Sequence, residues 1–507
     1  MKKNILQYLE RNAIEYPDKL AYSDLDAGYT WSKLYESSRH VGSYVADKLE
    51  YGSAVLVYMK KSADCFPAFF GAVYGGCFFV PIDDRMPADR INIIIGIVNP
   101  GLVIYDDKTK KNIDKLNCDC AKEHVSSVLE YPVSEEALDR IRDKMIDTDP
   151  LYVLFTSGST GIPKGVVVCH RSVIDYAEWV CDRFSLSSDT IFGNQTPFYF
   201  SMSVLDIYSN LCAGSTLYII PKMLFSFPVR LIEVLNDKKI NTIYWVPSAL
   251  SIVANLGTFE EICPKYLKTI LFAGEVMPTK QLNIWRKNIP DAIYANLFGP
   301  TEITDIGIYY ILDREFSDDE PIPIGYACDN VDMLVIAEDG KIITSDNPNA
   351  LGELYIRGSF LAHGYYKNPA KTAEAFVQNP VNDNYPELVY KTGDLVYYNT
   401  RGELVYSSRK DFQIKHMGNR IELGEIEAAL SAQDGVDVCC CLYDSQNDFI
   451  VAVFSGNAQE ENLRENMGQK VPTYMLPNVY MKLDNIPLNA NGKIDRLYLK
   501  KTYEDNK

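Results

Sequence analysis

Residues 154–166 read Leu154-Phe-Thr-Ser-Gly-Ser-Thr-Gly-Ile-Pro-Lys-Gly-Val166, and this stretch decides how the rest of the chain is interpreted. The apolar run from Leu151 to Phe155 predicts a buried strand. Small and hydroxyl-bearing residues follow, and then Lys164, so that backbone N–H groups and a cation can approach an anion closely. The stretch therefore predicts a phosphate-holding loop, with a flexible Ser/Gly turn as the alternative. It is not a Walker A loop, because the spacing of glycines before the lysine differs.

The composition is that of a globular protein with several domains. The chain has 507 residues, 47% hydrophobic and 23% charged. Its formal net charge of −18 argues against a general binder of nucleic acids or anionic membranes. The 12 cysteines include no pair of CxxC units, and residues 1–20 hold no apolar signal segment. We therefore expect no structural zinc, no membrane insertion and a cytoplasmic location.

The order of apolar and helical patterns predicts an α/β protein with two domains. Up to about residue 320, buried strands such as 54–58 and 267–272 alternate with helical patterns, which indicates stacked mixed sheets. Short strands and Gly, Asn and Asp turns then predict a β-rich subdomain. We expect a large domain over 1–410, with two α/β subdomains and the β-rich subdomain, and a small α+β domain over 411–507.

Four more motifs follow the opening stretch in a fixed order. They are Asn296-Leu-Phe-Gly-Pro-Thr-Glu302, Tyr390-Lys-Thr-Gly-Asp394, Ser408-Arg-Lys-Asp-Phe-Gln-Ile-Lys-His-Met-Gly-Asn-Arg-Ile-Glu422 and Asn489-Ala-Asn-Gly-Lys-Ile-Asp-Arg496. With all five, the chain resembles the adenylate-forming superfamily: acyl-CoA synthetases, luciferases and the adenylation domains of nonribosomal peptide synthetases. The segments 203–208, 272–278 and 411–415 make it most similar to D-alanine–carrier protein ligases.

The resemblance implies an AMP-forming ligase that uses ATP and Mg²⁺ and works in two steps. A carboxylate attacks the α-phosphorus of ATP to give an acyl-adenylate and pyrophosphate, and a thiol then attacks the acyl carbon. Such a phosphoryl transfer needs positioning and charge neutralisation more than covalent help. Glu302 resembles the Mg²⁺ ligand, Thr301 the contact to the α-phosphate, and Lys493 the lysine that bridges the substrate carboxylate and the α-phosphate. The residues that resemble the loop orienting the β- and γ-phosphates are Thr156, Ser157, Ser159, Thr160 and Lys164.

The same resemblance implies a site for the nucleoside and a hinge. Phe298 resembles the residue that stacks on adenine, Asn296 reads the base edge, and Asp394 and Arg409 bind the ribose. Asp411 stands at the hinge about which the small domain rotates between the two half-reactions. After rotation, Lys493 leaves the site, and the segment around Lys415 and Gly418 shapes the thiol channel.

The residues that would surround the acid depart from the pattern of amino-acid-activating relatives. Those relatives carry an aspartate, which binds the substrate ammonium, where this chain has Ser201. A hydroxyl cannot supply the charge-assisted hydrogen bond that compensates for burying an ammonium group. In D-alanine ligases a cysteine tends to stand where this chain has Ala273. The matched positions, here called the acyl-site residues, are Phe200, Ser201, Met202, Leu205, Tyr244, Leu271, Ala273, Leu297, Asp305 and Ile306.

This mostly apolar set favours an aryl acid such as a hydroxybenzoate, or an acid whose amine is displaced toward Asp305. The alternative for Asp305 is a solvated loop carboxylate, and we do not expect Asp206 to replace the missing aspartate, because its helical position aims it elsewhere.

Several alternatives stay open for the function itself. D-alanine remains possible as the substrate despite Ser201. No Gly-Gly-x-Ser motif of a carrier protein is visible, so we expect a separate acceptor, either a phosphopantetheinyl carrier protein or coenzyme A. A nucleotide-binding scaffold without turnover is the alternative from another class.

Overall fold

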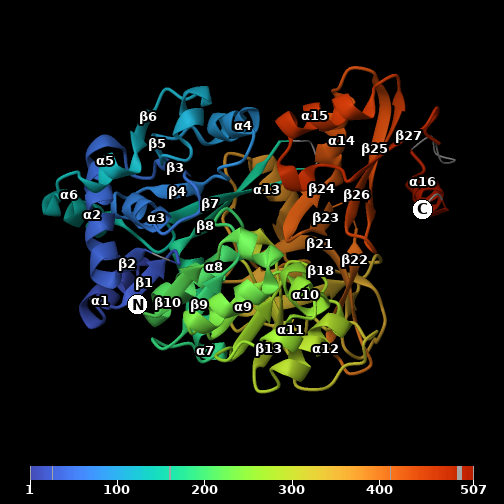
Figure 1. The fold of residues 1–507 in the computed structure, drawn as a ribbon, viewed down its shortest axis with the longest axis horizontal. Coiled ribbons are helices and arrows are strands. Elements are labelled where there is room, and N and C mark those ends of the chain that lie inside the picture. The colour runs from blue at the N-terminus through green and yellow to red at the C-terminus, as the bar shows by residue number, and fades with distance from the viewer. Residues whose placement is uncertain (1, 26, 159–161, 411–412, 488–493, 506–507) are drawn as a thin grey trace.

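The computed structural model describes residues 2–25, 27–158, 162–410, 413–487 and 494–505. Figure 1 shows two sheets with their helices in the N-terminal two-thirds of the chain, and the C-terminal strands β25 to β27 beside α14 and α15. A third, antiparallel sheet lies next to the C-terminal elements. The fold is therefore α/β with a β-rich subdomain and a small C-terminal α+β domain, as the sequence predicts.

The first sheet carries the stretch that opens the sequence analysis. Its strand order is β19-β8-β7-β4-β3-β5-β6, and its members from β3 to β7 pair in parallel, whereas β8 pairs antiparallel to β7. All five positions of β3 are buried, which is expected of a hydrophobic strand in a parallel sheet. The strands are β3 (Ala54–Tyr58), β4 (Phe78–Pro81), β5 (Leu102–Tyr105), β6 (Ala121–His124), β7 (Pro150–Thr156), β8 (Lys164–Cys169) and β19 (Gly364–Tyr365).

The second sheet has nine strands in the order β15-β14-β13-β12-β11-β9-β10-β1-β2. Its central strands from β13 to β1 pair in parallel, and antiparallel strands close both ends. The strands are β1 (Leu20–Ser23), β2 (Gly28–Thr30), β9 (Ile191–Asn194), β10 (Thr216–Ile219), β11 (Thr242–Trp245), β12 (Thr269–Phe272), β13 (Ile293–Phe298), β14 (Ile308–Ile311) and β15 (Tyr326–Ala327).

The helices of this part connect successive strands. They are α1 (Leu6–Glu15), α2 (Trp31–Lys48), α3 (Cys65–Tyr74), α4 (Ala88–Val98), α5 (Val125–Leu129), α6 (Glu135–Lys144), α7 (His170–Arg183), α8 (Ser203–Ala213), α9 (Pro228–Asp237), α10 (Pro247–Asn255), α11 (Thr258–Glu261) and α12 (Thr279–Asn288), with short 3-10 turns at Lys110–Lys115, Lys222–Ser226 and Thr301–Ile303.

Helix α3 links the cores of the two sheets. All ten of its residues are buried, which matches a helix that is apolar on every side. Its Phe66 ring stacks on Tyr22 of β1 with centroids 3.8 Å apart and contacts Phe198 at 5.1 Å. Phe69 stacks on Phe79 of β4 at 4.4 Å. The two sheets therefore share one continuous hydrophobic core, which holds them against each other.

The antiparallel sheet and the C-terminal elements complete the chain. The sheet has the order β17-β16-β18-β21-β20, and β22 pairs with the C-terminal part of β21. Its strands are β16 (Val331–Ile336), β17 (Ile342–Ile343), β18 (Gly352–Gly358), β20 (Phe376–Gln378), β21 (Leu388–Tyr398) and β22 (Leu404–Arg409), with α13 (Pro369–Ala375) before β20. The hairpin β23 (Gln413–His416) and β24 (Asn419–Glu422) follows, and then α14 (Leu423–Ser431), β25 (Val436–Asp444), β26 (Phe449–Gly456), α15 (Glu460–Lys470), a 3-10 turn at Thr473–Met475, β27 (Val479–Lys482) and α16 (Arg496–Asp505).

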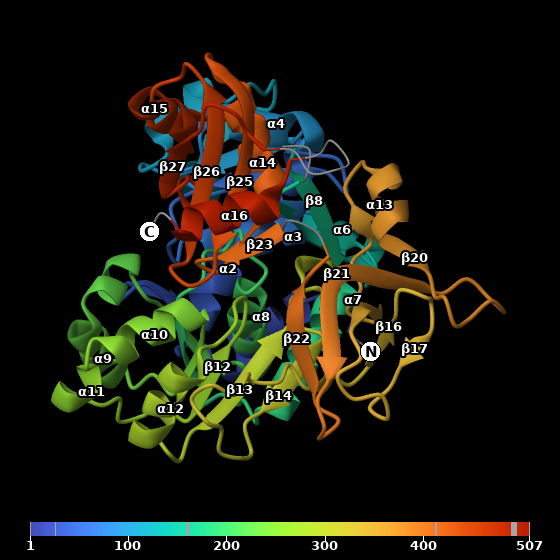
Figure 2. The ribbon, with the colours of Figure 1, turned by 90° about the vertical axis from the view of Figure 1, so that its right-hand side faces the viewer.

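The small C-terminal domain contacts the large one through charged side chains. Arg90 of α4 forms a buried ion pair with Glu425 of α14, and Lys470 of α15 lies 3.5 Å from Asp89. Figure 1 shows α15 next to α4, and Figure 2 shows the C-terminal domain in front of the first sheet and its helices. The predicted boundary at residue 411 falls between two described segments and stays a prediction. Within the described ranges, no helix combines the length and hydropathy needed to cross a membrane.

Candidate nucleotide and acyl site

The opening stretch contributes the end of β7 and the start of β8, which pair antiparallel. Thr156, at the end of β7, pairs with Lys164, at the start of β8, and its Oγ1 lies 3.5 Å from the Lys164 carbonyl oxygen. A Cβ added at Gly158 would lie 2.1 Å from the carbonyl oxygen of Ile162, so the backbone at these two residues lies closer together than a side chain at position 158 would allow. Ser159 and Thr160, two further predicted site residues, lie outside the described part of the chain.

Lys164 lies in a cluster of charged and aromatic groups. Its Nζ is 3.9 Å from Glu422 Oε1 and 5.3 Å from the centroid of the Tyr365 ring. Burial, together with repulsion from Arg420, lowers the pKa of Lys164 below its ordinary value. The Lys164 ammonium thus lies in partly desolvated surroundings, where it attracts an anion more strongly than it would in water.

Glu302 is the buried carboxylate of this cluster. It lies in the 3-10 turn after β13 and has no exposed surface. Tyr365 donates a hydrogen bond to Oε1 at 2.7 Å, and Arg420 Nη1 lies 2.7 Å from Oε2. Burial alone would raise the pKa of Glu302, but Arg420, Lys164 and the Tyr365 hydroxyl lower it to about 2. The side chain is therefore an ionised oxygen donor, the type that Mg²⁺ prefers.

The described residues contain no cluster of three or more Asp, Glu, His or Cys that could hold a metal ion. Glu302 accordingly fits a metal held by one carboxylate together with phosphate oxygens and water, which is the usual way in which Mg²⁺ binds beside a nucleotide.

The two residues predicted to bind the adenine lie on the same strand, β13. Phe298 ends β13, and Lys415 Nζ lies 4.7 Å from the centroid of its ring. Tyr406 lies at 6.0 Å from the same ring. Asn296 is buried, and its amide donates to the carbonyl oxygen of Pro323 at 2.9 Å. The Phe298 ring and the Asn296 amide thus both lie at the C-terminal end of β13.

Asp394 and Arg409 form the pair predicted at the ribose. Arg409 Nη1 lies 3.0 Å from Asp394 Oδ1 and also donates to the carbonyl oxygen of Thr392 at 2.9 Å. Residues 394 and 409 are directly paired across β21 and β22. The strand register therefore fixes both side chains at one edge of the antiparallel sheet.

The acyl-site residues gather at the ends of β11, β12 and β13 and at the start of α8. Nearly all of them are buried, namely Met202, Leu205, Tyr244, Leu271, Ala273, Leu297, Asp305 and Ile306. Ser201 is partly buried, and Thr301 Oγ1 donates to its hydroxyl at 3.1 Å. Phe200 contacts the Tyr474 ring of the small domain at 5.9 Å between centroids. The structure thus places Ser201 next to Thr301, the residue predicted at the α-phosphate.

Asp305 is buried, so the alternative of a solvated loop carboxylate is wrong. Only 1% of the residue is exposed. Tyr176 donates to its Oδ2 at 2.7 Å, and Tyr244 donates to the same oxygen at 3.3 Å. Burial holds the pKa of Asp305 well above its ordinary value, although both hydroxyls oppose the shift. Among the described residues no Lys, Arg or His forms an ion pair with this carboxylate. Tyr176 carried no signal in the sequence, because it lies within an ordinary amphipathic helix.

Asp206, which we did not expect to replace the missing aspartate, is also buried. Its Oδ2 accepts a hydrogen bond from the amide of Asn194 at 2.7 Å. Burial raises the pKa of Asp206 to about 7, with the Asn194 hydrogen bond and Lys61 opposing the shift. The Asp206 side chain thus extends from α8 to β9, where Asn194 hydrogen-bonds to it.

The hairpin β23–β24 of the small domain lies against these residues. Ser157 donates to the carbonyl oxygen of Arg420 at 2.9 Å and accepts from the N–H of Glu422 at 3.2 Å. Glu275 accepts from the N–H of Gly418 at 2.5 Å. Gly418 has φ +75°, and a Cβ there would lie 2.5 Å from Val246, so only glycine fits this approach. Arg420 and Glu275 lie within motifs that the sequence analysis quotes, but neither was predicted as a site residue.

Lys493 and Asp411, the predicted bridging lysine and hinge, lie outside the described residues, so their placement stays a prediction. Lys415 and Gly418, predicted at the thiol channel, lie over Phe298 and beside Glu275.

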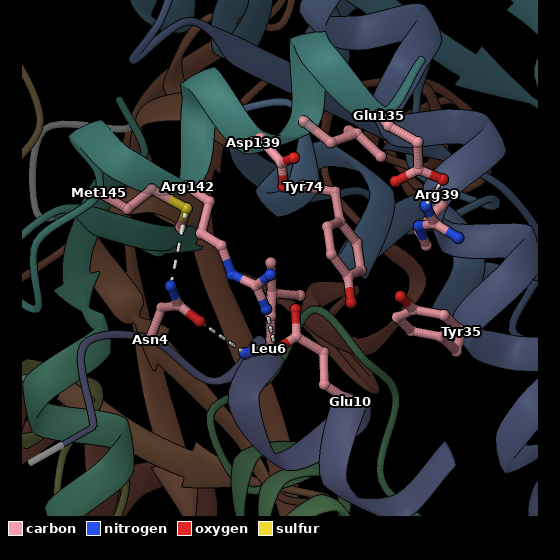
Figure 3. A pocket seen from close by; sticks show the side chains of 11 residues that line it. Asn4, Leu6, Glu10, Tyr35, Arg39, Tyr74, Glu135, Asp139, Arg142 and Met145 are labelled. Atoms are coloured by element: carbon pink, nitrogen blue, oxygen red, sulfur yellow. Dashed lines mark hydrogen bonds and ion pairs between the residues drawn. The ribbon is translucent and has the colours of Figure 1, made fainter. Parts of the chain in front are cut away.

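A separate polar pocket lies between α1, α2, α3 and α6 (Figure 3) and shares no residue with the site above. Arg142 pairs with Glu10 there, and Arg39 pairs with Glu135. These ion pairs join the helices, and they place no group near the nucleotide residues.

Comparisons with known proteins agree with this geometry. Residues 9–366 match the family described as AMP-binding enzyme. A D-alanine--D-alanyl carrier protein ligase of Bacillus cytotoxicus is 30% identical over 512 residues, which cover 97% of this chain and 98% of the relative. The Bacillus cereus protein of the same name is 30% identical over 506 residues, with the same shares. These matches confirm the resemblance that the five motifs predict.

Two solved structures share the fold. The Vibrio cholerae adenylation domain AlmE, in complex with glycyl-adenosine-5'-phosphate, has a TM-score of 0.85 at 20% identity, covering 99% of this chain and 98% of that one. PA1221, a protein with adenylation and carrier domains bound to a vinylsulfonamide inhibitor, has a TM-score of 0.81 at 21% identity, covering 99% and 84%.

The buried Asp305 carboxylate makes a prediction about stability. Because its folded pKa lies above the unfolded value of about 3.9, ionisation opposes folding, and the penalty grows as the pH rises from that value toward the folded pKa. Asn keeps an oxygen for both tyrosines and does not ionise. We expect Asp305→Asn to gain about 1–3 kcal/mol in free energy of unfolding relative to the unsubstituted protein between pH 5 and 8. Urea unfolding at several pH values measures the difference, and a constant difference across this range would contradict the account.

Proposed function

Because the chain belongs to the AMP-binding enzyme family and is an AMP-forming acid ligase, we propose that it loads a small amino acid onto the phosphopantetheine thiol of a separate carrier protein. A substrate carboxylate oxygen forms a bond to the α-phosphorus of ATP, and the bond to the bridging oxygen breaks to release pyrophosphate. The thiol sulfur then bonds to the acyl carbon, its proton is lost, and AMP leaves. The observation that carries the proposal is that Thr156, Lys164 and Glu302 lie close together and that Lys415 lies close enough to interact with both Arg420 of this cluster and the Asp394 carboxylate.

We assign the nucleotide by the groups that surround it. The turn after Thr156 and the Lys164 ammonium would hold the β- and γ-phosphates, the Phe298 face the adenine, and the Asp394 carboxylate the ribose hydroxyls. Mg²⁺ bound at Glu302 would neutralise phosphate charge as the α-phosphorus is attacked. Lys493 would stabilise the charge that develops between the carboxylate and the α-phosphate.

The choice of an amino acid rests on the relatives and on one buried carboxylate. The relatives named above are D-alanine ligases, which support the amino-acid alternative better than the aryl acid that the apolar lining favours. Ser201 offers no charge to an ammonium group. Asp305 can supply one: it accepts hydrogen bonds from both tyrosines at Oδ2 and forms no ion pair with a described residue, so a bound ammonium would stabilise its ionised form against the effect of burial. We therefore propose that Asp305 binds the substrate amine, which favours an amine displaced from the carboxylate over an α-amine.

The names of the same relatives indicate which thiol receives the acyl group. They are named as ligases that act on a D-alanyl carrier protein, and the chain covers almost their whole length. A carrier protein is therefore a better candidate than coenzyme A. Transfer to free coenzyme A remains the second candidate, because solved structures with this fold include a coenzyme A synthetase.

A panel of acids tests the substrate. We expect pyrophosphate release with a small amino acid whose amine reaches Asp305, and weak release with benzoates. Asp305→Asn should lower kcat/KM for that amino acid by about a hundredfold, because the buried ammonium loses a charged partner. Leu271, another acyl-site residue, provides a packing control: Leu271→Met should change kcat/KM much less. Activity confined to benzoates would refute the amino-acid proposal. No release with any acid, even with hydroxylamine present to trap adenylate, would favour the scaffold alternative.

The two half-reactions separate the role of Lys493. We expect Lys493→Ala to abolish adenylate formation, by about a thousandfold or more, but largely to spare thioester formation from a preformed adenylate. Rapid-quench assays of each half-reaction measure both rates. Lys500→Ala, at an exposed lysine of α16, serves as the control and should leave both rates unchanged. Equal loss in the two half-reactions would contradict rotation of the small domain.

A further inference from the structure

Strand β24 engages the groups that, under the proposed function, hold the metal and the phosphates. Glu302 is the proposed metal ligand, and Ser157 belongs to the proposed phosphate loop. Arg420 contacts both of them: its guanidinium lies 2.7 Å from Glu302 Oε2, and its carbonyl oxygen accepts a hydrogen bond from Ser157 at 2.9 Å. Arg420, a residue of the small domain, thus contacts the proposed metal ligand and the proposed phosphate loop at the same time.

Each oxygen of Glu302 already has a donor while the hairpin is in place. Tyr365 donates to Oε1 and Arg420 to Oε2. Tyr365 lies in β19 of the seven-stranded sheet in the large domain, where it pairs with Val166 of β8. Arg420 lies in β24 of the small domain, on the far side of the predicted hinge. Of the two partners, Arg420 is therefore the one that movement of the small domain removes.

The charges reinforce this geometry. The Glu302 side chain is fully buried, the Arg420 side chain is 17% exposed, and Lys164 lies close to both. A divalent cation at Glu302 would face two positive side chains in a region of low dielectric constant, where repulsion is strong. Without Arg420, by contrast, a buried carboxylate would lack its main counter-charge, which a metal can supply.

We propose that Arg420 and a divalent cation occupy Glu302 in turn, so that metal binding and docking of the β23–β24 hairpin exclude each other. The inference rests on the proposed function. Departure of the metal with pyrophosphate then leaves Glu302 free to attract Arg420, which couples release of the first product to arrival of the hairpin. Arg420 is in this sense a positioning residue, since it acts on the conformation of the site.

The test measures metal affinity directly. Mn²⁺ is titrated with β,γ-imido-ATP and the full-length protein, and bound metal is followed by water proton relaxation. We expect Arg420→Gln to bind the Mn²⁺–nucleotide complex about tenfold more tightly than the unsubstituted protein, because the competing cation is gone. Arg420→Lys keeps the charge and should stay within about twofold. The affinity for the metal-free nucleotide, measured with EDTA, should not change.

A matched control separates the specific effect from a general loss of positive charge. Arg464 lies on the surface of the small domain, where it pairs with Glu460 at 2.7 Å and also contacts the carbonyl oxygen of Asn478 and the Tyr480 ring. Arg464→Gln should leave the Mn²⁺–nucleotide affinity unchanged. An equal gain in Arg464→Gln, an equal gain for metal-free nucleotide, or no gain in Arg420→Gln would each overturn the proposal.

Glu302→Gln distinguishes this inference from the proposed function. If that variant binds Mn²⁺–nucleotide as tightly as the unsubstituted protein, Glu302 is not the metal ligand, and both fail. If it binds more weakly while Arg420→Gln shows no gain, only the alternation of Arg420 and metal fails. Hydrogen exchange gives a second readout: the amides of Gly418 and Glu422, which bond to Glu275 and Ser157, should exchange faster with Mg²⁺–nucleotide than with nucleotide and EDTA.

Discussion

The buried carboxylate of Glu302 is the constraint on which the rest of the site depends. A charge without exposed surface is costly unless other groups compensate for it. Here the compensation comes from three distant parts of the chain: Tyr365 in β19, Lys164 in β8 and Arg420 in β24. Two of these belong to the large domain and one to the small domain. The electrostatics of a single side chain thus connect the proposed phosphate loop, the first sheet and the small C-terminal domain.

The architecture explains why this charge lies where the chemistry is expected. The turn that carries Glu302 follows β13 of the nine-stranded sheet, whereas Lys164 starts β8 of the seven-stranded sheet. Helix α3 packs between the cores of the two sheets and fixes their spacing. Ligands of α/β proteins bind beyond the carboxyl ends of parallel strands. Two such edges face each other here, and β21 and β22 of the antiparallel sheet add the Asp394–Arg409 pair.

The sequence predicts the elements well and their distant contacts poorly. Apolar runs such as 54–58 and 267–272 mark β3 and β12 to within two residues, because burial on both faces leaves a continuous hydrophobic pattern. Motif order also places Glu302, Asp394 and Arg409. The Arg420–Glu302 contact joins positions far apart in the sequence, and Tyr176 reaches Asp305 from another helix. No local pattern encodes such pairs, since they depend on how sheets and helices pack together.

The position of negative charge among the acyl-site residues gives the strongest clue to specificity. At position 201 a hydroxyl replaces the carboxylate of amino-acid-activating relatives, and it accepts a hydrogen bond from Thr301, next to the proposed α-phosphate. The charge lies instead at Asp305, between Tyr176 and Tyr244. Two hydroxyl donors on one oxygen only partly offset the cost of burying this carboxylate, so a cation that binds beside it would stabilise its ionised form. If the substrate carboxylate lies near Thr301, an ammonium group at Asp305 must be held away from it, and the spacing between these two side chains then selects the length of the amino acid.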